Sequence, residues 1–197
     1  MWATPLQLAT AAAIVANEGR VVEPRMLKAV EGVAYEPVIE NPIPDVMVED
    51  PDYWRYIQEA MTMVVHRPFS DEFRDYGTAF EAIAMADRAM PYKMAGKSGS
   101  AQVVGISQEI LASTDIEVSD LNKDHALFIS FAPALNPYIE PQIAIAVFVE
   151  NGEQGSSVAG PIAKAITDAY LLDILQLDFD AMERAAESNR LISQADD

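Results

Sequence analysis

The segment Tyr92-Lys-Met-Ala-Gly-Lys-Ser-Gly-Ser-Ala-Gln-Val-Val104 decides how this chain is interpreted. Apolar residues bound it on both sides, and a Lys-Ser-Gly-Ser run, here called the K-S-G-S segment (residues 97–100), lies inside it. Such a pattern predicts a β-strand. Because successive side chains of a strand point to opposite faces, Lys97 is expected to point away from Ser98, whereas Ser98 and Ser100 share a face.

The Gly96-Lys97-Ser98 triplet by itself suggests a phosphate-binding loop, but its surroundings exclude one. A Walker A motif needs a glycine five residues before Gly96, where Pro91 stands, and it opens a helix rather than a strand. Lys97 is also badly placed to activate Ser98 as a nucleophile, because the two side chains diverge.

Two hydroxyls and backbone N–H groups on one face of the strand could instead bind a carboxylate, and Gly99 lets a ligand approach the backbone closely. Taken alone, the four residues favour a plainer interpretation, a glycine-containing strand with two ordinary serines, because short motifs often match by chance.

Two further apolar segments predict strands that pair with each other: His125 to Ala132, and Gln142 to Glu150. The short connection of residues 133–141 favours an antiparallel pair. Both faces of the second segment are apolar, so helices are expected on both sides of the sheet. The sequence therefore predicts an α/β chain of the α+β type, with antiparallel strands flanked by helices. The polar stretch Gly105 to Asp124 is expected to be a long loop.

Helix signals precede these strands. Thr4-Pro-Leu-Gln7 combines a capping threonine, a proline at the first helical position and a glutamine that completes a capping box. The alanine-rich run that follows is expected to be helical to Glu18 and to stop at Gly19. A second helix is predicted from Asp50 to about Val65, and a short one begins at Gly77-Thr78-Ala79.

The last predicted helix follows a turn at residues 151–155. Ser156 or Ser157 is expected to cap it, and Pro161 falls near its first turn, where a missing N–H costs least. From about Asp178 the chain is acidic, and we expect a frayed tail there. One apolar stripe of this helix is predicted to comprise Ile162, Ala165, Ile166, Ala169 and Tyr170.

Composition limits the possible functions. The 197 residues suit one domain, and a net charge of -18 argues against nucleic acid as a partner, because such a surface repels phosphates. Cysteine is absent and the carboxylates lack the spacing of calcium or zinc ligands, so no metal or other cofactor is predicted. No apolar run approaches the roughly 18 to 20 residues of a membrane span, and no signal peptide is expected at Met1. His125 is expected to be structural.

The order and spacing of several motifs resemble the class B penicillin-binding proteins, and most closely their elongation-specific group. Lys-(Ser/Thr)-Gly is the third signature of penicillin-recognising serine enzymes, whereas the other two, S-x-x-K and S-x-N, are missing from this chain. Ser100 stands where the family more commonly has threonine. The matching pieces are Trp2-Ala-Thr-Pro-Leu-Gln-Leu-Ala9, Asn17-Glu-Gly19, Val22-Glu-Pro24, Gly77-Thr-Ala79, residues 92–103, Asp124-His125, Phe131-Ala-Pro133 and Val149-Glu-Asn-Gly152.

The resemblance implies that residues 1–172 form the C-terminal half of an αβα transpeptidase domain, followed by an acidic tail at residues 173–197. The nucleophilic serine and its lysine would precede this half. The chain would then supply the opposite wall of the cleft, and alone it is expected to be inactive.

The resemblance also assigns roles to the K-S-G-S segment. Lys97 would help to hold the serine of the missing S-x-N motif and would make the electrostatic potential of the site more positive. The hydroxyls of Ser98 and Ser100 would bind the substrate carboxylate, and the backbone N–H of Ser100 would be one oxyanion donor. Lys97 and Ser100 are thus the predicted catalytic residues, and Gly99 and Ala101 complete the predicted substrate-binding strand.

The implied reaction is serine acyl transfer on D-Ala-D-Ala stem peptides of peptidoglycan during cell-wall elongation, with β-lactams acylating the same serine. The resemblance also implies a place at the periplasmic face of the bacterial inner membrane, beside a glycan-strand polymerase and other cell-elongation proteins. Two alternatives stay open. One is a non-catalytic half-domain that binds a peptide or partner protein. The other, a β-lactam sensor or β-lactamase, fits the Thr4-Pro5 and Gly77-Thr78-Ala79 segments less well.

Overall fold

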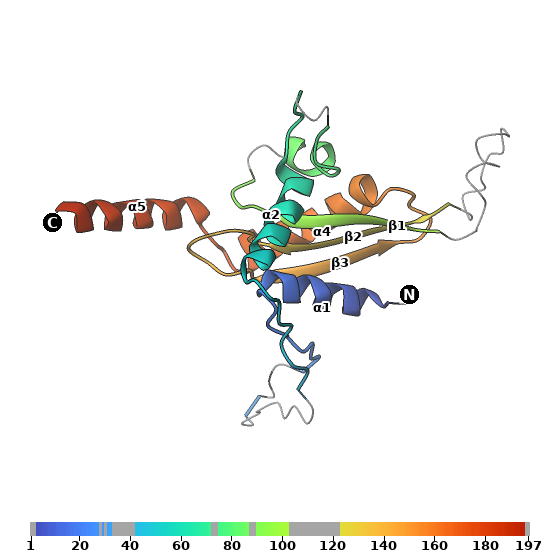
Figure 1. The fold of residues 1–197 in the computed structure, drawn as a ribbon, viewed down its shortest axis with the longest axis horizontal. Coiled ribbons are helices and arrows are strands. Elements are labelled where there is room, and N and C mark those ends of the chain that lie inside the picture. The colour runs from blue at the N-terminus through green and yellow to red at the C-terminus, as the bar shows by residue number, and fades with distance from the viewer. Residues whose placement is uncertain are drawn as a thin grey trace.

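A three-stranded antiparallel sheet forms the centre of the chain (Figure 1). The computed structural model describes residues 3–27, 29, 31–32, 42–71, 75–86, 90–102 and 123–195. The strands are β1 (Ala95–Ala101), β2 (His125–Ala132) and β3 (Ile143–Val149), in the order β1-β2-β3. Each lies inside a segment that the sequence predicted. Val103, Val104 and most of the predicted loop that follows lie outside the described residues.

Helices cover both faces of this sheet, and the alternating side chains of β2 show which helix covers which face. Phe131 is buried with Ala16 of α1 (Pro5–Ala16), which packs against β2 and β3. Phe128 points the other way and is buried with Ala163 of α4 (Gly160–Asp168). The predicted arrangement of antiparallel strands flanked by helices is therefore confirmed.

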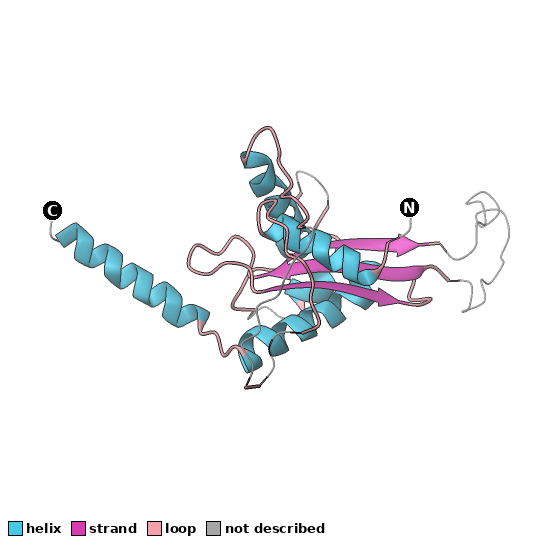
Figure 2. Ribbon diagram, turned by 90° about the horizontal axis from the view of Figure 1, so that it is seen from below, coloured by secondary structure: helices cyan, strands magenta, loops and turns pink. Residues whose placement is uncertain are grey.

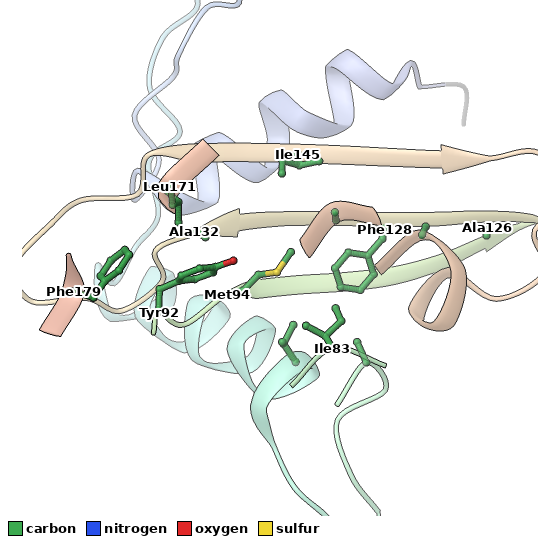
Figure 3. Packing of buried hydrophobic residues seen from close by; sticks show 13 residues of the cluster. Ile83, Tyr92, Met94, Ala126, Phe128, Ala132, Ile145, Leu171 and Phe179 are labelled. Carbon is green, nitrogen blue, oxygen red and sulfur yellow. The ribbon is translucent and has the colours of Figure 1, made fainter. Parts of the chain in front are cut away.

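The larger core lies on the α4 side of the sheet, where Ile83, Met94 and Phe128 are completely buried (Figure 3). Ile83 comes from a short helical turn, η1 (Glu81–Met85), where a short helix was predicted. The longer α2 (Asp52–His66) packs against β1, and its Gln58 amide donates to the Val15 carbonyl at 2.9 Å, near the end of α1.

The start and end of α1 follow the sequence signals closely. Thr4 accepts from the Gln7 N–H at 3.2 Å, and the Gln7 side chain accepts from the Thr4 N–H at 2.8 Å, which completes the predicted capping box. Gly19 has the left-handed φ of 92°. A Cβ at this position would lie 2.3 Å from the Val46 carbonyl oxygen and 2.8 Å from the Trp54 ring, so only glycine fits.

The last predicted helix differs from expectation in its start and in its buried face. It begins with π-type turns, η3 (Gly155–Ala159). Ser156 and Ser157 lie inside these turns rather than before them, and Gln154, which does precede them, makes no side-chain cap. The caps predicted at Ser156 or Ser157 are therefore wrong. The helical period predicts which residues share a face, but it does not decide which face packs on the sheet. The predicted stripe is also wrong, because Ile162 and Ile166 are 43% and 45% exposed. The residues buried in their place are Ala163, Thr167 and Leu171.

The C-terminal segment is a helix, α5 (Phe179–Ala195), which projects from the rest of the molecule (Figure 2), so the expected frayed tail is wrong. The Asp178 carboxylate accepts from the Ala181 N–H at 2.8 Å and stabilises the first turn. Phe179 anchors the helix, because it is buried against Tyr92 with ring centroids 5.7 Å apart. The division of the chain at residue 172 stays a prediction.

Candidate active site

The K-S-G-S segment lies on an edge strand. In the described part of the chain β1 pairs only with β2, which leaves its other edge open. Just before β1, the Lys93 carbonyl accepts from Ala134 on the β2 side at 2.8 Å, and the next N–H, that of Met94, donates to His66 Nε2 at 3.0 Å. Because backbone groups alternate along a strand, the N–H of Ser100 points to the same open edge as that of Met94.

Lys97 brings a cation to this edge. Its side chain shares a face with Ala95, the face that α1 covers, whereas Ser98 lies on the opposite face, as predicted. The Lys97 ammonium donates to the Ser98 carbonyl oxygen at 2.6 Å. That carbonyl also faces the open edge, so the exposed Lys97 side chain folds over the edge of the strand.

The Ser98 hydroxyl lies 3.4 Å from the Thr78 hydroxyl. Thr78 is held close to α2, because the flanking Gly77 and Ala79 N–H groups donate to the Arg67 and Val64 carbonyls, each at 2.9 Å. The sequence offered Gly77-Thr78-Ala79 as the start of a short helix and as a piece of the family resemblance, and not as part of the site. The resemblance was the signal that could have marked Thr78.

The Ser100 hydroxyl shares the face of Ser98, as predicted, but it donates to the Glu153 carbonyl oxygen at 2.9 Å. A carboxylate ligand needs a hydroxyl donor, so the Ser100 hydroxyl must turn away from Glu153 to fill the predicted role. Gly99 is exposed, and Ala101 is partly buried opposite His125. Glu153 was not a candidate from the sequence, because its contribution is a backbone carbonyl.

The two histidines support the sheet. Burial, and secondly the nearby Lys93 ammonium, lower the pKa of His66, which keeps the imidazole neutral so that Nε2 can accept from Met94. His125 Nδ1 accepts from the Asn151 N–H at 3.0 Å, and its ring packs against Phe148 with centroids 4.9 Å apart. The structural role predicted for His125 is confirmed by these contacts.

The assembled groups can hold and polarise a substrate, but a nucleophile paired with a base is not among them. Three cavities among the described residues lie away from this strand: one between α1 and β3, one at the end of α1, and one beside His66. In this described part, no three acidic or histidine side chains come together as metal ligands. Among the same residues, every helix is too short or too polar to cross a membrane.

Comparison with known proteins identifies a family for this strand and its neighbours. Residues 1–168 match the model of the penicillin binding protein transpeptidase domain. Among curated relatives, the peptidoglycan D,D-transpeptidase MrdA of Acinetobacter baumannii is 38% identical over 174 residues. MrdA of Haemophilus influenzae is 36% identical over 171 residues. Each match covers 86% of this chain, but the chain spans only 22% and 24% of these relatives.

A solved structure agrees with this assignment. The crystal structure of Pseudomonas aeruginosa PBP2 in complex with WCK 5153 superposes on the chain with a TM-score of 0.65 and 40% sequence identity. The match covers 86% of this chain and 31% of that protein. The fold and the sequence identity thus point to the same family.

Proposed function

The chain belongs to the penicillin-binding protein transpeptidase domain family, and on that premise we propose that its K-S-G-S segment forms one wall of a site for serine acyl transfer on peptidoglycan stem peptides. The chain is homologous to part of the PBP2-type D,D-transpeptidases. Its S-x-x-K and S-x-N partners are then supplied by polypeptide that is outside these 197 residues.

One observation carries the proposal: the Lys97 ammonium and the Ser100 N–H lie at the same open edge of β1. A carbonyl oxygen that gains negative charge beside this edge would meet a backbone donor and a cation. Fixed donors of this kind stabilise the tetrahedral intermediate of acyl transfer, and removing one typically lowers the rate about 10²–10³-fold.

In the proposed reaction a serine oxygen attacks the carbonyl carbon of the penultimate D-Ala. The bond from that carbon to the nitrogen of the terminal D-Ala breaks, and D-Ala leaves with the serine proton. An amine of a neighbouring stem peptide then attacks the ester and releases the serine. With a β-lactam the ring amide opens in the same first step, and the ester remains. During both steps the Lys97 ammonium would hold the serine hydroxyl of the S-x-N partner.

The family assignment also supports a proposal about setting. We place the complete protein at the periplasmic face of the inner membrane, beside a glycan-strand polymerase and other proteins of cell elongation. The net charge of -18 is consistent with protein and peptide partners rather than nucleic acid.

A hybrid protein tests the function. Residues 1–168 would replace the matching segment of Pseudomonas aeruginosa PBP2, which supplies the missing motifs. Labelling with a fluorescent penicillin is expected for the hybrid and for unaltered PBP2, and not for the 197-residue chain alone. A folded hybrid that stays unlabelled while PBP2 is labelled would contradict the proposal, and so would covalent labelling of the chain alone.

The competing function, a non-catalytic half-domain, makes a different prediction. Its open β1 edge would bind an extended peptide by strand addition. The 197-residue chain would then bind a stem peptide reversibly, and the hybrid would remain unlabelled.

A further inference from the structure

The turn at residues 151–155, between β3 and η3, lies against the K-S-G-S segment at two points. The first is the carbonyl oxygen of Glu153, which accepts from the Ser100 hydroxyl at 2.9 Å. The second is the backbone of Gly155, which packs on the strand itself. The turn therefore touches both the side chain and the main chain of the proposed site.

The contact at Gly155 leaves no room for a side chain. A Cβ there would lie 2.1 Å from the Leu127 carbonyl oxygen, and 2.6 and 2.9 Å from the carbonyl oxygen and nitrogen of Gly99. Leu127 and Gly99 are partners across β1 and β2. Gly155 thus lies directly over the pair that fixes the middle of the K-S-G-S segment, and the atoms it meets are backbone atoms, which cannot turn aside.

The turn is itself held in place. Asn151 and Glu153 have left-handed φ angles of 56° and 62°, so neither residue sits in a relaxed extended backbone. The Asn151 N–H donates to His125 Nδ1, and its side-chain amide donates to the Lys123 carbonyl, both at 3.0 Å. The Glu153 N–H donates to the Asp124 carbonyl at 2.8 Å. These bonds tie the turn to the beginning of β2.

We propose that the 151–155 turn is the positioning element of the K-S-G-S segment, with Gly155 and Asn151 as positioning residues. The turn fixes Gly99 from one side and directs the Ser100 hydroxyl away from the open edge. The Ser100 N–H is then left facing that edge in a fixed orientation. The inference rests on the proposed function, because the geometry that the turn fixes is the geometry that acyl transfer would use.

A matched pair of glycines makes the inference testable. Gly155→Ala forces a methyl group against the Gly99 and Leu127 backbone. Gly19→Ala makes the same substitution at the end of α1, outside the turn, where the new Cβ would lie 2.3 Å from the Val46 carbonyl oxygen and 2.8 Å from the Trp54 ring. Both variants are crowded, but only the first presses on the K-S-G-S segment.

In the 197-residue chain, amide hydrogen exchange followed by NMR measures how firmly the strand is held against local opening. Gly155→Ala is expected to raise exchange at Gly99 and Ala101, whose N–H groups face β2, about tenfold relative to the amides of β3, and Gly19→Ala is expected to leave that ratio unchanged. Equal ratios in the two variants would overturn the inference. If Gly155→Ala does not fold, Asn151→Gly keeps the left-handed backbone, removes the amide anchor, and must raise the same ratio.

In the hybrid with PBP2, the rate of acylation by a penicillin separates this inference from the proposed function. Gly155→Ala should slow acylation about tenfold or more, because displacing a reacting group by about 1 Å can cost about 10²-fold. Gly19→Ala should leave the acylation rate within about threefold of that of the unaltered hybrid. An unaltered hybrid that is not acylated refutes the proposed function. An acylated hybrid that Gly155→Ala leaves equally fast refutes the positioning role alone.

Discussion

Mild acidification should destabilise this chain through His66, before most carboxylates titrate. The folded protein holds the pKa of His66 below its ordinary value of 6.5, mainly by burial. A depressed histidine pKa favours the neutral form in the folded state. The resulting stability is therefore present above pH 6.5 and is lost as the pH falls below it. Protonation would also remove the acceptor for the Met94 N–H, at the start of the strand that carries the K-S-G-S segment.

The size of the effect has a ceiling. Linkage allows about 1.4 kcal/mol per pH unit for one proton, so lowering the pH from about 7.5 to about 5.5 can remove at most about 1.4 kcal/mol. His66 is only partly buried and lines a cavity of about 410 Å³, so solvent screens part of the effect. We expect a loss of about 0.5 kcal/mol, measured as the change in unfolding free energy from urea titrations.

His66→Gln is the matched control, because the glutamine oxygen can still accept from Met94 but does not titrate in this range. The difference in stability between the two pH values should shrink by about 0.5 kcal/mol in this variant. If the native chain and His66→Gln lose the same stability on acidification, the reasoning about His66 is refuted.

Three further substitutions test the packing of the chain by urea unfolding. Thr4→Ala removes the capping box and should cost about 1 kcal/mol, with Thr10→Ala on the same helix costing less; equal costs would contradict the capping role. Phe128→Ala should cost about 3–5 kcal/mol, because the ring is completely buried between the sheet and α4; a cost below about 1 kcal/mol would place it outside the core. Ser130→Ala should be neutral or stabilising by up to about 1 kcal/mol, because this buried hydroxyl has no hydrogen-bond partner among the described residues; a loss above about 1 kcal/mol would show a partner.

Local signals in the sequence predicted those features of the fold that depend on neighbours along the chain. The capping box of Thr4 and Gln7 and the left-handed stop at Gly19 need only a few adjacent residues, and both are present. The opposite directions of Lys97 and Ser98 follow from strand geometry alone, and the structure confirms them.

Features that depend on distant contacts were not predictable in the same way. The period of an α-helix groups Ile162 and Ile166 on one face, but it does not decide which face packs on the sheet, and this one is exposed. The small Ala163 and the self-bonded Thr167, whose hydroxyl donates to the Ala163 carbonyl at 2.8 Å, are buried instead. The buried position of Thr167 is possible because its hydroxyl is satisfied within the helix.

The same limit applies to the site and to α5. Glu153 joins the site through its carbonyl, a group that every residue carries, so no side-chain pattern marks it. An acidic composition suggested a frayed end after Asp178, whereas the ring contact of Phe179 with Tyr92 anchors a helix there. The contacts of Glu153 with Ser100 and of Phe179 with Tyr92 join residues that are far apart in the sequence, so local patterns did not predict them.

The most direct test of the central claim is the rate of penicillin acylation of the hybrid with Lys97→Ala, measured by intact-protein mass spectrometry. Lys93→Ala is the control, because this lysine lies four residues earlier on the same side of the chain but away from the proposed site. If Lys97 forms the wall of an acyl-transfer site, its loss should slow acylation about 100-fold. The acylation rate of Lys93→Ala should stay close to that of the unaltered hybrid. Equal acylation of both variants and the unaltered hybrid would contradict a catalytic role for the K-S-G-S segment.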